Sequence, residues 1–277
     1  MRLTQKLLSE YQEQGHLFFP GYFSAAEMGA IQAELPAIFA EEAPQRVLEK
    51  DGLAVRSVYG SHNTNEILGR LARDARLVEP AMQILESAVY IHQFKINAKA
   101  AFGGDKWEWH QDYIFWRNED GMPAPRVTNV LIFVDETNEF NGPLMLIPGS
   151  HREKVLEIAG FAGVPDGYGE SPLWISNLTA KLKYALSKEL LARLVEQYGM
   201  VAPKGPRGSV LIFHGNLVHG SGVNMSPFER RVICISYNSV ENIPRPVEKQ
   251  RPEFLAGRDY RPLELLRAAE SSLTPTE

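Results

Sequence analysis

The most informative part of the chain is Trp107-Glu-Trp-His-Gln-Asp-Tyr-Ile-Phe-Trp-Arg-Asn-Glu-Asp-Gly-Met-Pro123. Within it, His110-Gln-Asp112 places an imidazole and a carboxylate two residues apart. On an extended segment, positions i and i+2 face the same way, so both side chains could meet one metal ion. His-x-Asp alone is a weak pattern, more often a coincidence of surface polar residues. It predicts a metal site only if another ligand joins it from elsewhere.

The best candidate for that ligand is His219, which follows the apolar strand Val210-Leu-Ile-Phe-His214 and a short turn. Two histidines and one carboxylate on one face of an octahedral ion leave three positions open, as non-haem iron oxygenases require. His214 competes with His219 because it lies five residues earlier in the same segment. We rank His214 second, as a core histidine or one that supports a ligand.

Apolar spacing around these motifs predicts helices first and short strands afterwards. Helices are expected at residues 4–14, from Ser24 onward, at 65–86 and at 187–198. Strands are expected at 90–97, 128–134, 144–147, 209–213 and 232–237. Helices followed by many short strands are typical of an α+β chain with a β-sandwich or barrel core.

The length of 277 residues and the lack of a linker favour a single domain, 1–277. We expect a helical part over about 1–87, a strand-rich core over about 88–242 and an extended tail over about 243–277. The net charge of −5 argues against a nucleic-acid partner, and no apolar run favours a membrane role. Cys234 is the only cysteine, so no internal disulfide forms and a cytoplasmic location fits best.

A possible anion site follows the second metal histidine. Arg230 lies eleven residues after His219. A keto-acid cosubstrate that chelates iron needs its far carboxylate clamped, and a guanidinium does this through paired charge-assisted hydrogen bonds. The alternative is a surface arginine paired with Glu229. The residues alone leave both interpretations open.

One face of the strand that begins near residue 89 is unusually polar. Gln93, Lys95, Asn97 and Lys99 alternate, so all four side chains share a face. Two lysines and two amides suit a pocket for carboxylates, although a solvent-exposed face is the alternative. His92 alternates with Gln93, so we expect it to face away from this pocket.

Four blocks of the chain, in order, resemble the phytanoyl-CoA dioxygenase superfamily. The first is the stretch quoted above, which is similar to its metal-binding signature. The others are Val89 to Asp105, Asn141 to His151, and Phe213 to Ser221 with Arg230. Within the superfamily the likeness is strongest to ectoine hydroxylase and the free-leucine 5-hydroxylases. It runs from about residue 46 to 258.

The resemblance implies a double-stranded β-helix (jelly-roll) core with helices packed outside. It implies iron(II) held by His110, Asp112 and His219, with 2-oxoglutarate and dioxygen as cosubstrates. The 2-oxoglutarate would bind Arg230, helped by Lys99, Asn97 and Ser221, while Gln93 would lean toward the substrate. In related halogenases a small residue replaces the carboxylate, so Asp112 implies hydroxylation.

The expected substrate is a free aliphatic L-amino acid, with leucine as first choice. The same chemistry on ectoine, proline or another small metabolite is the alternative, and a non-catalytic jelly-roll binding protein is a more distant one. Acyl-CoA is disfavoured because no basic cluster stands out for its phosphates.

Candidate substrate contacts are Arg56, Tyr59 and Trp116. Each has a plainer interpretation, as a surface arginine, a packing tyrosine and a core tryptophan. The glycine-rich insertion at 160–172 could be a lid that closes on substrate.

Overall fold

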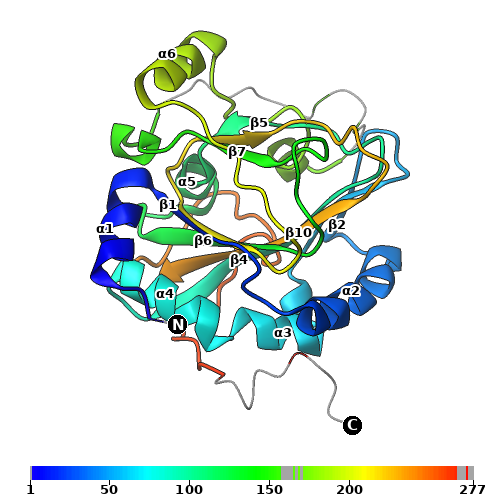
Figure 1. Ribbon diagram of the computed structural model, residues 1–277, viewed down its shortest axis with the longest axis horizontal. Helices are drawn as coiled ribbons and strands as arrows, with labels where there is room; N and C mark the ends of the chain where they lie inside the picture. Colours follow the sequence, from blue (N-terminus) through cyan, green and yellow to red (C-terminus); the bar gives the residue numbers. More distant parts are fainter. Residues whose placement is uncertain (1, 157–164, 166–167, 169–170, 267–272, 274–277) are drawn as a thin grey trace.

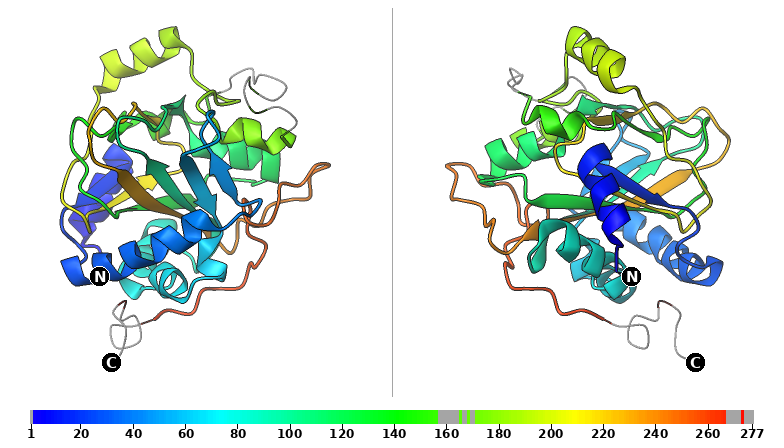
Figure 2. Two further views of the ribbon diagram at one scale, coloured as in Figure 1. Left: turned by 90° about the vertical axis from the view of Figure 1, so that its right-hand side faces the viewer. Right: turned by 60° about the vertical axis from the view of Figure 1, so that its left-hand side comes forward.

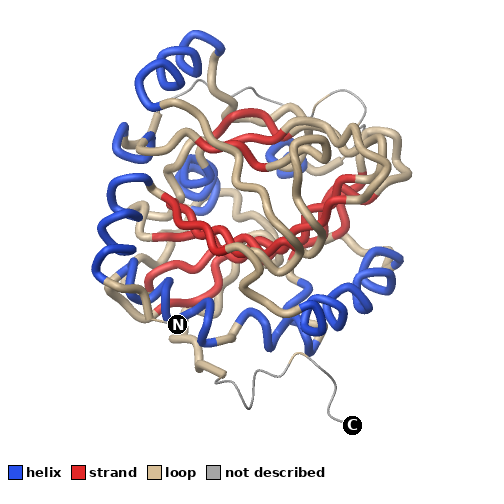
Figure 3. Tube along the Cα trace, viewed as in Figure 1, coloured by secondary structure: helices blue, strands red, loops and turns tan. Residues whose placement is uncertain are grey.

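The computed structural model describes residues 2–156, 165, 168, 171–266 and 273. Two antiparallel sheets face each other, with helices outside them (Figures 1 and 3). In chain order the elements are α1 (Gln5–Gln14), β1 (His16–Phe19), α2 (Ala25–Ala40), β2 (Arg46–Leu48), β3 (Val55–Tyr59), η1 (Ser61–Asn63), α3 (Glu66–Ala72), α4 (Ala75–Leu85), β4 (Val89–Lys99), β5 (Trp107–His110), α5 (Asp112–Phe115), η2 (Trp116–Asp120), β6 (Val127–Phe133), β7 (Leu144–Leu146), η3 (Ser150–Glu153), η4 (Leu173–Asn177), α6 (Lys188–Tyr198), β8 (Val210–His214), β9 (His219–Ser221) and β10 (Arg230–Ser239).

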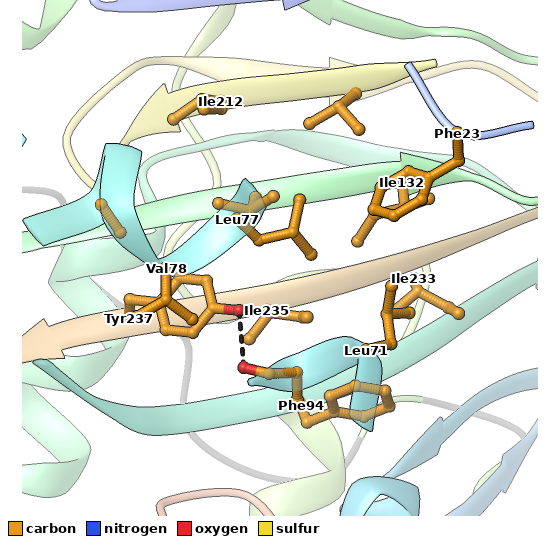
Figure 4. Close-up of a cluster of buried hydrophobic side chains, with 14 of the residues drawn as sticks. Phe23, Leu71, Leu77, Val78, Phe94, Ile132, Ile212, Ile233, Ile235 and Tyr237 are labelled. Atoms are coloured by element: carbon orange, nitrogen blue, oxygen red, sulfur yellow. Dashed lines mark hydrogen bonds between the residues drawn. The ribbon is translucent and has the colours of Figure 1, made fainter. Parts of the chain in front are cut away.

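The large sheet has seven strands in the order β1-β8-β6-β10-β4-β3-β2, and the small sheet has three in the order β5-β9-β7. Helices α2, α3 and α4 cover the outer face of the large sheet (Figure 2). Alternate strand residues such as Ile132, Ile233 and Ile235 point into that layer and pack against the helices (Figure 4). Burying each such side chain contributes roughly 1.5–3 kcal/mol, so this layer is the main hydrophobic core.

The inner face of the large sheet meets the small sheet. Its apolar part is a second cluster that includes Leu131, Phe133, Phe213 and Val232, with Leu146 from the small sheet. Strand alternation sends one set of side chains to the helices and the other into the space between the sheets. The α+β class with a two-sheet core is therefore as expected.

Two details differ from the expected elements. The helical pattern at 65–86 forms two helices, because the Asp74 side chain accepts a hydrogen bond from Arg76 N and starts α4 afresh. The part expected to be helical also contains β1, β2 and β3, which are three to five residues long and join the edges of the large sheet. Such short strands carry little periodicity of their own.

The remaining parts of the chain can be placed briefly. Residues 243–266 form neither helix nor strand, and Arg251 and Leu255 within them are buried. Most of the 160–172 insertion lies outside the described residues, so the lid remains a prediction. In the part of the chain that is described, no helix has both the length and the apolar character needed to span a membrane.

Candidate functional site

The register of the small sheet brings two distant histidines together. Strands β5 and β9 are antiparallel, and His110 lies directly opposite His219. Their ring centroids are 4.2 Å apart. Directly opposed residues of an antiparallel pair project to the same side of the sheet. The predicted pairing of these two histidines is therefore a direct consequence of strand register.

Asp112 reaches the same point by a different route from the one expected. Strand β5 ends at His110, Gln111 keeps an extended backbone, and Asp112 opens helix α5. The Gln111 side chain fixes this turn by donating to the carbonyls of Lys154 and Asn216, at 2.8 and 2.7 Å. The expectation of one extended His-x-Asp segment is thus wrong, because the chain turns from strand to helix within the motif.

Backbone hydrogen bonds aim the two imidazoles. His110 Nδ1 donates to the Glu108 carbonyl at 2.6 Å, and His219 Nδ1 donates to the Leu217 carbonyl at 2.9 Å. Each Nε2 is then left as a lone-pair nitrogen. These atoms lie 3.5 and 3.6 Å from the two carboxylate oxygens of Asp112. The three ligand atoms lie within 4.8 Å of one another, so they could hold one metal ion.

The protonation states suit metal binding. Burial and the neighbouring His110 lower the pKa of His219 to about 3. Burial alone would raise the pKa of Asp112, but Lys95 and the two histidines outweigh it and hold that pKa well below its usual range. Neutral imidazole and ionised carboxylate are the forms that bind metals. Lys95 Nζ lies 3.9 Å from Asp112 Oδ1.

Asn129 supports Asp112 from the middle of the large sheet. Its Nδ2 donates to Asp112 Oδ2 at 2.8 Å, and its Oδ1 accepts from Ser236 Oγ at 2.6 Å. Asn129 and Ser236 are fully buried. No role was predicted for Asn129 from the sequence, although an asparagine inside the apolar run Thr128 to Val134 indicates a buried polar contact.

We expect Asn129→Leu to weaken metal affinity roughly 10- to 100-fold, as is typical when the partner of a ligand is removed. Titration of metal-free protein with Mn(II), followed by electron paramagnetic resonance, measures the change. Ser236→Ala is the control, because it removes only the support of Asn129 and should have a smaller effect. Unchanged affinity in Asn129→Leu would contradict the assignment.

The other histidines considered, His214 and His92, are not part of the metal triad. His214 Nδ1 accepts a hydrogen bond from Asn216 N, and its ring lies 5.2 Å from that of His151. His92 was expected to face away from the pocket, and it is not among the residues that line the site cavity. It lies at a β-bulge opposite Ser236 and Tyr237. His92 Nε2 lies 3.0 Å from Asp120 Oδ2, at the end of η2.

A cavity beside the triad is polar at one end. The metal-side histidines His110 and His219 form part of its wall, and the remaining lining residues are Lys95, Asn97, Lys99, Trp107, Leu131, Leu144, Ser221, Arg230 and Val232. Lys95, Asn97 and Lys99 alternate along β4 and share its inner face, as predicted. The solvent-exposed alternative for this face is wrong, because the β4 lysines and asparagine are buried or half-buried.

Two buried cations lie at the polar end. Arg230 is 4% exposed, and burial lowers its pKa to about 10. Burial and the charge of Arg230 lower the pKa of Lys99 to about 6. Arg230 Nη2 donates to the Gly142 carbonyl and Lys99 Nζ to the Asp105 carbonyl, both at 2.5 Å. A buried guanidinium beside a buried amine, both bonded only to neutral carbonyls, forms a site that a bound anion would stabilise.

The surrounding polar atoms fit a dicarboxylate. Among the described residues, Asn97 Oδ1, Ser221 Oγ and Arg230 Nε are buried without a hydrogen-bond partner in the protein. Buried polar atoms without a partner are uncommon and call for an explanation. The Arg230–Glu229 alternative is not what forms: Glu229 pairs with the neighbouring Arg231. The predicted cosubstrate residues thus converge, and the two unpartnered donors, Ser221 Oγ and Arg230 Nε, suit a carboxylate of 2-oxoglutarate.

The predicted substrate contacts do not line this cavity. Gln93 is buried and donates to the Leu255 carbonyl at 2.7 Å. Tyr59 belongs to a cluster with Ile175, Leu178 and Leu255, and Trp116 to one with Tyr113, Met122 and Val127. Arg56 is not at the surface but fully buried, and pairs with Glu49. The plainer interpretation, packing, describes the environments of Tyr59 and Trp116.

A buried ion pair between Arg251 and Asp120 was not predicted from the sequence. Arg251, from the extended tail, donates to both oxygens of Asp120 at 2.8 and 2.6 Å. No local pattern signals this contact, because the two residues are 131 positions apart. Asp120 also contacts His92 of β4 at 3.0 Å, so the pair lies beside that strand.

Comparison with known proteins agrees with this geometry. The family model described as phytanoyl-CoA dioxygenase matches residues 11–232. An L-proline trans-4-hydroxylase from Streptomyces griseoviridis is 38% identical over 254 residues, covering 91% of this chain and 92% of that protein. An ectoine dioxygenase from Bordetella bronchiseptica is 37% identical over 283 residues, covering 97% of this chain and 88% of that protein.

Solved structures show the same relationship. EctD from S. alaskensis with 2-oxoglutarate and 5-hydroxyectoine superposes with a TM-score of 0.81 at 32% identity, covering 96% of this chain and 88% of that one. The form with bound Fe has a TM-score of 0.80 at the same identity and coverage. The similarity spans both sheets and the helical layer, which confirms the expected jelly-roll fold.

Proposed function

The chain belongs to the phytanoyl-CoA dioxygenase family, and on that premise we propose that it hydroxylates a free cyclic amino acid, with L-proline as first choice and ectoine as second. Its class is iron(II)- and 2-oxoglutarate-dependent dioxygenase, acting with dioxygen on small metabolites. The observation that carries the proposal is the buried triad of His110, Asp112 and His219 beside a cavity lined by Lys99 and Arg230. A non-catalytic binding protein would not need that combination.

We assign iron to His110, Asp112 and His219. The donor set of two neutral imidazoles and a carboxylate is typical of non-haem iron oxygenases. Bound iron, 2-oxoglutarate and dioxygen supply the oxidising power. The three ligands are already held by hydrogen bonds with Glu108, Leu217 and Asn129, so little reorganisation accompanies metal binding.

We assign the far carboxylate of 2-oxoglutarate to Arg230, with Ser221 beside it. Lys99 and Asn97 complete the polar end of the cavity. A charge-assisted pair with a guanidinium is stronger than a neutral hydrogen bond and fixes orientation. The unpartnered Arg230 Nε and Ser221 Oγ support this assignment.

The proposed substrate site is assigned from the charged side chain nearest to the metal ligands. We propose that the carboxylate of the amino acid lies near Lys95, the cation nearest to Asp112. The charge of Arg251 reaches the same region. We propose packing or positioning roles for the other predicted substrate contacts, which are Gln93, Tyr59, Arg56 and Trp116. The relatives named above act on L-proline and ectoine, so these alternatives replace leucine as first choice.

A substrate panel tests the proposal. Purified protein with Fe(II), 2-oxoglutarate and dioxygen is incubated separately with L-proline, ectoine and L-leucine. Mass spectrometry is expected to show a gain of one oxygen with L-proline or ectoine, and NMR identifies the hydroxylated carbon. Turnover of L-leucine alone would overturn the cyclic assignment. Absence of succinate with every substrate would favour the binding-protein alternative.

We also propose a reducing compartment such as the cytoplasm as the location. Cys234 is free and buried beside Asn129 and the triad. Burial raises the pKa of its thiol to about 12, which makes it unreactive.

A further inference from the structure

Arg56 makes hydrogen bonds inside the protein through all three of its guanidinium nitrogens. It is fully buried. Its Nε donates to the Leu178 carbonyl at 2.8 Å and its Nη2 to the Lys106 carbonyl at 2.9 Å. Its Nη1 lies 3.3 and 3.2 Å from the two carboxylate oxygens of Glu49. The guanidinium plane also covers the Trp107 ring, 3.9 Å from its centroid.

These contacts join two different parts of the molecule. Trp107 lines the cavity that holds Arg230 and Lys99. Leu178 belongs to residues 171–186, which we call the return segment because they follow the insertion and lead into α6. The return segment also bonds to β5, through Leu182 N to Glu108 Oε2 at 3.0 Å and Leu186 N to the Trp109 carbonyl at 2.8 Å. It therefore lies along the strand that carries His110.

The hydrogen bonds of Arg56 also lead to Lys99 in the 2-oxoglutarate pocket. Glu49, the partner of Arg56, accepts a hydrogen bond from Asp105 N at 3.0 Å. The Asp105 carbonyl in turn accepts from Lys99 Nζ. Arg56 is thus linked to the cavity on one side by Trp107 and on the other through Glu49, Asp105 and Lys99. A lysine at this position could not make these contacts, because it offers a point charge and no planar fork.

We propose that Arg56 is a positioning residue that couples the return segment to the 2-oxoglutarate pocket. This inference deepens the proposed function and rests on it. Occupation of the pocket, through Lys99 and Trp107, is transmitted to the return segment, which is then held against the metal strand β5. An ordered wall beside the active site excludes water and keeps the substrate in place. Loss of Arg56 should therefore allow 2-oxoglutarate to be consumed without hydroxylation.

Stability alone does not account for this arrangement. Replacing a buried ion pair by apolar residues of similar volume is often neutral or stabilising, so such a pair is weak evidence of a purely stabilising role. Arg56 instead specifies one arrangement of three segments, which are β3, the start of β5 and the return segment. A positioning role predicts effects that a loss of stability would not produce.

Arg56→Lys is the main variant, since it keeps the charge and most of the volume. The matched control is Arg76→Lys. Arg76 also pairs with two carboxylates, those of Glu27 and Asp74, and its guanidinium lies over Phe23 at 4.4 Å. It lies in the helical layer, far from the triad in sequence and outside the cavity lining. Glu49→Gln is the second variant, used if Arg56→Lys does not fold.

The first measurement is hydrogen–deuterium exchange on the metal-free protein, which does not depend on the substrate. Exchange at residues 173–186 is expected to quicken about tenfold in Arg56→Lys, as local opening becomes easier, and to stay unchanged in Arg76→Lys. The second is the ratio of hydroxylated product to succinate. It should fall by about half or more in Arg56→Lys, with the KM for 2-oxoglutarate raised severalfold, and remain at the unmutated value in Arg76→Lys.

The outcomes are distinguishable. Unchanged exchange in the return segment, or a product-to-succinate ratio that falls equally in both variants, would overturn the coupling role. If the unmutated protein hydroxylates none of the panel, the proposed substrate is wrong, and the exchange measurement alone decides the role of Arg56.

Discussion

Replacement of His219 by alanine is expected to abolish hydroxylation. The His219 imidazole supplies one of three ligand atoms that lie within 4.8 Å of one another. A triad reduced to two ligands should lose far more than the roughly 10- to 100-fold typical of a supporting residue. Iron content after gel filtration and succinate formation measure the effect. The fold should persist, because β9 keeps its backbone pairing with β5 and β7.

His214→Ala is the matched control, five residues away on the same segment. His214 packs against His151 and bonds to Asn216 N, and it is not part of the triad. Burial and the nearby His151 lower its pKa to about 4, so it is neutral. We expect some loss of stability but retained iron. Equal loss of iron in both variants would show that the ligand assignment is wrong.

Arg230→Ala is expected to raise the KM for 2-oxoglutarate by about 100-fold or more. Truncating one partner of a buried hydrogen-bonded charge pair costs roughly 2–5 kcal/mol, and each 1.4 kcal/mol is about tenfold. Metal affinity should change little, because Arg230 is not one of the three clustered ligands. Steady-state kinetics with varied 2-oxoglutarate, and calorimetric titration of the Mn(II)-loaded protein, measure the two quantities separately.

Arg231→Ala tests whether this effect belongs to the cavity. Arg231 is adjacent in sequence, but its side chain points to the other face and forms a bidentate pair with Asp135 at 2.7 and 2.8 Å. We expect a modest loss of stability and an unchanged KM for 2-oxoglutarate. If Arg230→Ala leaves the KM unchanged as well, the cosubstrate carboxylate binds elsewhere.

The candidate site was accessible from the sequence because its residues lie in strongly patterned segments. The alternation of Lys95, Asn97 and Lys99 needed only the two-residue period of a strand, and β4 has that geometry. Likewise, Ser24 and Glu27 form the capping box that opens α2. Local rules are dependable where the backbone is regular.

The same rules do not apply where the backbone is irregular, as in the β-bulge at His92, and they do not reveal a distant partner. Arg56 resembled a surface arginine by type, but Glu49 and the carbonyl of Leu178, 122 residues away, make its burial possible. A charged side chain can be buried only where the fold supplies partners, and a single sequence does not reveal them.

From its sequence alone, this chain could be given its helices, most of its core strands, and the residue types of a non-haem iron site with a cationic pocket. The helices and strands follow from periodicity, which acts over a few neighbouring residues, whereas the resemblance to the family implied the iron ligands and the cosubstrate pocket. Only the tertiary structure shows that His219 rather than His214 faces His110, that Asn129 holds Asp112, and that Arg56 joins the return segment to the cavity. Each of these contacts depends on strand register or joins segments more than 15 residues apart, and local sequence patterns do not indicate such contacts.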